Sequence, residues 1–121
     1  MPQYVVFAVD DDEDAWEQAD EETRNETYAA DQAFIELLEQ RGGRVVGGAD
    51  LSHSRDTRVL TRAADGPAVV TDGPYAETVE QVSGFYIVEC DDLETVVEAA
   101  RLMAEGHTRL EVRPRPRKDQ S

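Results

Sequence analysis

Cysteine, lysine and long apolar runs are all scarce in this sequence of 121 residues. Cys90 is the only cysteine, which excludes an internal disulfide and a metal site built from several cysteines. No apolar run approaches the roughly 18 residues of a membrane-spanning helix, and no basic segment precedes the apolar stretch near the N-terminus as in a signal peptide. We therefore expect a cytoplasmic protein that has no membrane partner.

Positive charge is scarce as well, since 12 Lys+Arg residues stand against 27 Asp+Glu residues and give a net charge of -15. Arg24 is the only basic residue among residues 1–40, so most of the excess lies in the first third of the chain. A negative field repels phosphate backbones, which excludes nucleic acid as a direct partner. The length indicates one domain, residues 1–114, followed by a short basic segment at 115–121 that we expect to be a mobile tail.

Local periodicity predicts two helices and several strands. Apolar spacing of three and four residues favours a helix over residues 22–41, and a second helix is expected to begin with Asp91 as N-cap and to end at Gly106. Strands are predicted for residues 4–9, 44–51, 84–90 and 109–113, and turn residues at 65–67 predict a hairpin with arms at 57–62 and 68–71.

This order of elements predicts an α+β domain with a ferredoxin-like βαβ-βαβ plan, an inserted hairpin, and an antiparallel sheet with two helices on one face. The strands at 4–9 and 84–90 carry apolar side chains on both faces, whereas one layer of helices covers only one face. The uncovered face needs a partner, and a second copy of the chain is the simplest one. We therefore expect a homodimer.

The segment 69–78, which reads VVTDGPYAET, and the tripeptide GFY at 84–86 resemble the signature of the DGPF family within the YCII-related proteins. The resemblance implies a dimeric α/β barrel of ferredoxin-like subunits. Some DGPF-type proteins are encoded near extracytoplasmic-function sigma factors, and the wider group is suspected of catalysis through a His and Asp pair. The first predicted helix of this chain contains no histidine, so the resemblance assigns that pair to no particular residues here.

The Asp-Gly-Pro-Tyr turn at residues 72–75 has two interpretations. As architecture, an aspartate bonds to neighbouring backbone N–H groups and the following glycine adopts a positive φ. As a catalytic site, Asp72 and Glu77 present two carboxylates for proton transfer. Three further side chains or backbone positions would then bind the ligand: Arg62, Gly73 and Tyr75.

The two histidines are the other acid–base candidates. His53 lies in a loop with Asp56 three residues later and is the weaker catalytic candidate beside Asp72 and Glu77, while His107 follows Gly106 and is interpreted as part of a helix end. No spacing typical of a zinc site occurs, and no glycine-rich phosphate loop follows a strand, so neither a metal nor another cofactor is predicted.

Two functions remain open. The first is a small-molecule-binding protein, in which a cleft beside the Asp-Gly-Pro-Tyr loop performs cofactor-free acid–base catalysis. The second is an accessory or regulatory interaction protein, for example one associated with a sigma factor, with the acidic first third of the chain as its contact surface.

Overall fold

The computed structural model describes residues 1–73 and 80–116. Within them the elements follow in this order: β1 (Gln3–Asp10), α1 (Glu13–Gln18), α2 (Glu21–Gln40), β2 (Arg44–Asp50), the 3-10 turn η1 (Ser54–Asp56), β3 (Arg58–Thr61), β4 (Val69–Asp72), β5 (Gln81–Glu89), α3 (Leu93–Ala100), the 3-10 turn η2 (Arg101–Glu105) and β6 (Arg109–Pro114). No helix among the described residues is long and apolar enough to cross a membrane.

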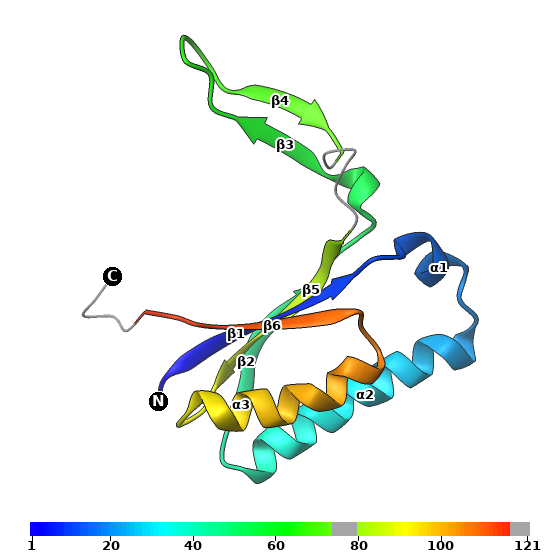
Figure 1. Cartoon of the computed structure of the whole chain (residues 1–121), viewed down its shortest axis with the longest axis vertical. Helices are drawn as coiled ribbons and strands as arrows, with labels where there is room; N and C mark the ends of the chain where they lie inside the picture. The colour runs from blue at the N-terminus through cyan, green and yellow to red at the C-terminus, as the bar shows by residue number, and fades with distance from the viewer. Residues whose placement is uncertain (74–79, 117–121) are drawn as a thin grey trace.

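Four strands form an open antiparallel sheet in the order β2-β5-β1-β6. Both long helices, α2 and α3, lie on one face of this sheet, as Figure 1 shows. The predicted α+β class, with an antiparallel sheet and two helices on one face, is therefore confirmed. The acidic connection before α2 contains the additional short helix α1.

The core lies between the sheet and the two helices. Alternate residues of β1, among them Val6 and Ala8, point toward the helices and are buried. Phe34 and Leu38 of α2 and Met103 of η2 are fully buried against them. The helical spacing read from the sequence therefore identifies the inward side of α2 correctly, and α2 differs from the predicted range by one residue at each end.

Two details of the second helix differ from the prediction. The N-cap is Asp92 instead of Asp91, because the Asp92 carboxylate accepts a hydrogen bond from the Thr95 amide at 2.8 Å. The helix is also not regular to its end: α3 stops at Ala100 and the chain continues as η2, which Gly106 closes. An N-cap carboxylate reaches the amide three residues later, so Asp91 lies one position too early.

The β3–β4 hairpin projects away from the sheet and helices (Figure 1). Leu60 and Val70 are cross-strand partners on it, and they are 66% and 58% exposed. On the sheet, the face opposite the helices carries Phe7 and Phe85, whose ring centroids lie 6.5 Å apart. The described part of the chain thus leaves an exposed apolar pair on the hairpin and a half-buried aromatic pair on the sheet face that no helix covers.

Candidate functional site

A histidine held between two carboxylates forms a largely buried polar cluster in the described part of the chain. Asp10 ends β1, Asp31 lies in the middle of α2, and His107 occupies the turn between η2 and β6. The side chains of His107, Asp31 and Asp10 are only 10%, 16% and 25% exposed. Segments separated by up to 97 residues in the sequence therefore meet at one point.

Hydrogen bonds fix the orientation of the imidazole. Nδ1 of His107 lies 3.1 Å from Oδ2 of Asp10, and Nε2 lies 3.1 Å from Oδ1 of Asp31. The Tyr86 hydroxyl donates to Oδ2 of Asp31 at 2.9 Å, and the Ser83 hydroxyl donates to Oδ2 of Asp10 at 2.5 Å. Both ring nitrogens are thus occupied, which holds the ring in one position.

The environment keeps His107 protonated at neutral pH. Burial by itself lowers the pKa of the imidazole, but the hydrogen bonds and charges of Asp10 and Asp31 outweigh it and raise the pKa of His107 to about 9. For Asp10, burial raises the pKa, and hydrogen bonds from His107, Ser83 and the Thr108 amide more than offset this, so the pKa lies below its usual value. Burial, together with the charge of Asp31, also raises the pKa of Tyr86.

Three glycines allow the segments around this cluster to approach closely. A Cβ on Gly106 would lie 3.1 Å from the Thr27 backbone, which is tighter than most Cβ contacts, so the glycine favours the close approach of the turn that carries His107 to α2. Gly48 has a φ of +146°, and a Cβ there would lie 2.3 Å from the Phe85 carbonyl oxygen. A Cβ on Gly84 would lie 3.0 Å from the Ala49 carbonyl oxygen. The backbones of β2 and β5 therefore lie close to each other beside the cluster.

A cavity of about 210 Å³ opens next to His107. It is smaller than the roughly 300–1,000 Å³ of pockets for drug-sized ligands, so it suits a molecule of few heavy atoms. The lining comes from both sheet and helix layers and consists of Ala8, Asp31, Gly48, Ala49, Asp50, Ser83, Gly84, Phe85, Tyr86, Met103 and His107.

Sequence reasoning missed this cluster, and only one local signal pointed to it. Asp31 lies three residues before Phe34 and seven before Leu38, on the side of α2 that faces the core. A charged residue on an apolar helical face needs a buried partner. That signal does not name the partner, and His107, which was interpreted as part of a helix end, instead supplies the buried imidazole between the two carboxylates.

The structure describes only part of the predicted Asp-Gly-Pro-Tyr site. Asp72 ends β4 with its side chain 89% exposed, and Oδ1 lies 3.2 Å from Nε of Arg58. Arg58 and Asp72 are cross-strand partners, whereas Arg62 follows β3 at the opposite end of the hairpin. Arg58, and not Arg62, is therefore the cationic neighbour of Asp72, because the hairpin register puts Arg58 opposite the carboxylate.

The remaining residues of that prediction divide into two groups. Gly73 has a φ of +70° and donates its amide to the Thr57 carbonyl at 2.7 Å, as the turn interpretation expects. Tyr75 and Glu77 lie outside the described residues, so the proposed Asp72 and Glu77 carboxylate pair stays a prediction.

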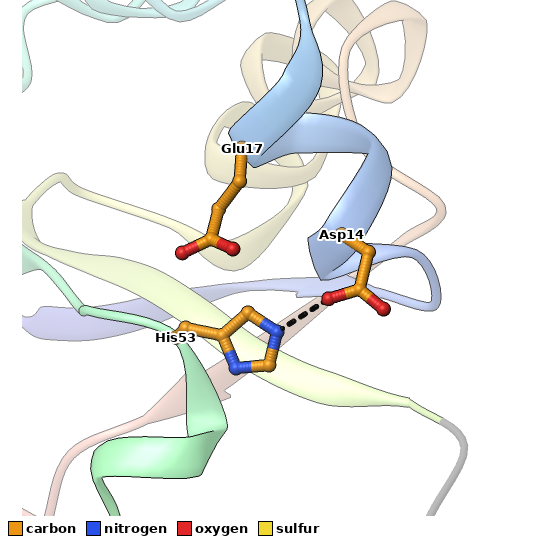
Figure 2. A group of neighbouring side chains, drawn as sticks. All are labelled: Asp14, Glu17 and His53. Carbon is orange, nitrogen blue, oxygen red and sulfur yellow. Dashed lines mark hydrogen bonds and ion pairs between the residues drawn. The ribbon is translucent and has the colours of Figure 1, made fainter.

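His53 lies in a separate cluster with the first short helix, which Figure 2 shows. Its Nε2 is 2.8 Å from Oδ1 of Asp14, and its Nδ1 accepts a hydrogen bond from the Arg55 amide at 3.0 Å and lies 3.3 Å from Oε2 of Glu13, so these residues and not Asp56 contact the imidazole. One ligand atom each from Asp14, Glu17 and His53 lie within 4.8 Å of one another, a group that could hold a metal ion. Arg55 already forms two hydrogen bonds with the Glu17 carboxylate, at 2.7 and 2.5 Å, and balances its charge.

A second cavity of about 210 Å³ lies beside this cluster, at the base of the hairpin. Glu13, Ser54 and Thr57 are among the residues that line it. Thr57 also binds the Gly73 amide, so the cavity adjoins the end of β4. Sequence spacing did not indicate this arrangement, because Asp14 and His53 are 39 residues apart.

Comparisons with known proteins agree with the sequence signature. Residues 3–113 match the profile of the YCII-related domain. An uncharacterised protein of Rhizobium meliloti (strain 1021) is 30% identical over 117 residues, an alignment that covers 92% of this chain and 90% of that protein. A match over nearly the whole length establishes membership, and the chain belongs to the YCII-related family.

Proposed function

We propose that this protein binds a small molecule in the cavity beside His107 and carries out proton transfer there without a cofactor. The supporting observation is a charged imidazole, held by two carboxylates, on the wall of a cavity that a small ligand can enter. Perturbed titratable groups that line a cavity are typical of acid–base sites. The cavity therefore replaces the cleft beside the Asp-Gly-Pro-Tyr loop as the first candidate site.

His107 is the proton-transfer group in this proposal. With a pKa of about 9 it is almost fully protonated at neutral pH, so it must first release this proton, to the ligand or to solvent, before the neutral imidazole can act as a general base. Asp31 and Asp10 stabilise the charged form and orient the ring. After the transfer, the neutral imidazole recovers a proton from solvent or from the product, which completes the cycle.

A ligand screen with two histidine variants tests this function. Thermal melting of the full chain is followed against small acids, amines, alcohols and ketones, and each hit is repeated with His107→Gln and with the matched control His53→Gln. We expect a reproducible stabilisation that His107→Gln abolishes and His53→Gln retains. A hit unaffected by His107→Gln would refute the assignment. If no compound of the panel raises the melting temperature and a specific protein partner is recovered, the interaction-protein hypothesis is favoured.

The strand order and the uncovered sheet face support a finer description of the assembly. The order β2-β5-β1-β6 with every neighbouring pair antiparallel is the one a ferredoxin-like βαβ-βαβ unit requires. Val5 and Phe7 pair with Ile87 and Phe85 on the face that the helices leave open. We expect two copies to pack through this face as a dimeric α/β barrel, with the exposed hairpin completing the contact.

A charge on that face tests the assembly. Such an interface should bury about 800 Å² per subunit, and a buried carboxylate in it would lack a partner. Phe85→Asp should convert a dimer into a monomer in light scattering at micromolar concentration, whereas Gln40→Asp, which adds the same charge at an exposed position at the end of α2, is the control and should leave the dimer intact. A wild-type chain that is monomeric under these conditions would contradict the dimer.

The Asp72 loop remains a second proposed site. Asp72→Asn keeps a side chain that can bond to the turn backbone and removes only the carboxylate charge. If the loop serves catalysis with Glu77, this variant loses ligand binding or turnover while it stays folded. If the loop is architecture, the variant behaves as the wild type.

A further inference from the structure

The side-chain hydrogen-bond donors on the wall of the His107 cavity are already committed. Both N–H groups of the His107 imidazolium go to Asp10 and Asp31, the Tyr86 hydroxyl goes to Asp31, and the Ser83 hydroxyl goes to Asp10. No lysine or arginine lines the cavity among the residues that the structure describes. A ligand therefore meets side chains that can accept hydrogen bonds but have few left to donate.

The acceptors, in contrast, retain free capacity. A carboxylate offers about four lone-pair positions, and each oxygen of Asp31 uses one. Asp50, at the edge of the cavity on β2, makes no side-chain hydrogen bond or ion pair within the described residues. Its Oδ1 lies 3.5 Å from the position that a Cβ on Gly84 would occupy, so the glycine leaves space beside this carboxylate.

The charges around the cavity favour the same kind of ligand as the free hydrogen-bond acceptors. Asp31 and Asp50 line the cavity, Asp10 of β1 contacts the imidazole from outside this lining, and His107 is the only positive group on the wall among the described residues. The lining therefore carries an excess of one negative charge, and Asp10 adds a second one close by. An anion entering the cavity would lose its water and meet two carboxylates and an imidazolium whose N–H groups are both engaged, whereas a cation would gain two charged acceptors.

We infer that this cavity takes a small organic cation, a protonated amine or amidine, which the carboxylates of Asp31 and Asp50 bind directly. The inference rests on the proposed function and specifies its ligand class. The ligand cation and the imidazolium share Asp31, so they compete for the same carboxylate. Binding consequently promotes release of a proton from His107 to solvent, which converts the locked imidazolium into a neutral base next to the ligand.

Competition of this kind is reciprocal, because a cation that lowers the proton affinity of His107 must bind more tightly when His107 is neutral. Burial and the two carboxylates set the pKa of His107 at about 9, so this coupling acts above neutral pH. The affinity for an amidine should rise between pH 7 and pH 9, by at most about tenfold per pH unit for a single coupled proton.

Calorimetric titration of the full chain with benzamidine and benzoate, two probes of similar shape and opposite charge, tests the inference. We expect binding of benzamidine only, an affinity that rises from pH 7 to pH 9, and at least fivefold weaker binding by Asp50→Asn. Asp65→Asn is the matched control: it removes the same charge from an exposed position on the hairpin and should leave the affinity unchanged. In His107→Gln the pH dependence should disappear.

Three results would overturn the inference: no binding of benzamidine, preferential binding of benzoate, or equal effects of Asp50→Asn and Asp65→Asn. A benzoate or neutral ligand that shifts the NMR signals of the His107 ring would refute the cationic ligand class and leave the proposed function intact. A cation that binds without any response from His107 would refute the competition. The wider screen decides the proposed function separately, since it does not depend on ligand charge.

Discussion

Replacing His107 by glutamine should remove a pH-dependent part of the stability. The pKa of His107 is raised from its ordinary 6.5 to about 9 in the folded protein. A raised pKa means that folding favours the protonated form, so the stabilisation is fully present below the unfolded pKa and is lost as pH rises through the folded one. The total is about 3 kcal/mol, because each pKa unit corresponds to roughly 1.4 kcal/mol.

Linkage gives the course of this loss across the accessible range. With pKa values of 6.5 and about 9, protonation of His107 contributes about 3 kcal/mol at pH 6.5, about 2 kcal/mol at pH 7.5 and less than about 1 kcal/mol at pH 9. His107→Gln lacks this contribution. The difference in unfolding free energy between wild type and variant should therefore fall by roughly 2 to 3 kcal/mol from pH 6.5 to pH 9. A constant offset remains, because both proteins differ in the hydrogen bonds to Asp10 and Asp31.

Urea unfolding of both proteins at several pH values measures this difference directly, and titrating groups that do not contact His107 cancel between them. NMR titration of the imidazole ring checks the pKa itself. His53→Gln is the control, and its difference from the wild type should not follow this curve. A difference for His107→Gln that changes by less than about 1 kcal/mol over the range would show that the carboxylates do not hold the proton, and would refute the charged triad.

Three further outcomes follow from the packing and the charge. Gly48→Ala should destabilise the protein by at least about 2 kcal/mol in urea unfolding, since its Cβ would lie 2.3 Å from the Phe85 carbonyl oxygen. Gly42 also has a positive φ but has nothing within 4 Å of a Cβ, so Gly42→Ala should cost about 1 kcal/mol. Equal costs of the two substitutions would contradict the steric explanation. Asp92→Ala should lower stability by about 1 kcal/mol through the lost N-cap and Asp91→Ala by less, and the reverse order would show that the cap is misassigned. Because the chain carries a net charge of -15, the melting temperature should rise between low and molar NaCl, and a flat or falling curve would count against self-repulsion.

Local elements of this protein were determined by its sequence. The spacing of apolar residues predicted α2 nearly to its ends, because in a helix of 3.6 residues per turn the residues of the buried face recur every three or four positions. Alternation and turn residues likewise predicted the strands of the sheet and the β3–β4 hairpin. The paired uncovered residues, Phe7 and Phe85, followed from strands that are apolar on both faces. Each of these features depends on residues close together in the chain.

The candidate site was decided by the tertiary structure alone. Asp10, Asp31 and His107 become neighbours only after β6 pairs with β1 and after η2 packs against α2. No local period links positions that are 76 or 97 residues apart, so neither the pairing of these side chains nor their burial can be predicted from sequence spacing. Sequence reasoning therefore favoured Asp72 and His53, whose neighbours in the chain were visible. Packing buried the other histidine between two carboxylates, and burial is what makes that charge interaction strong.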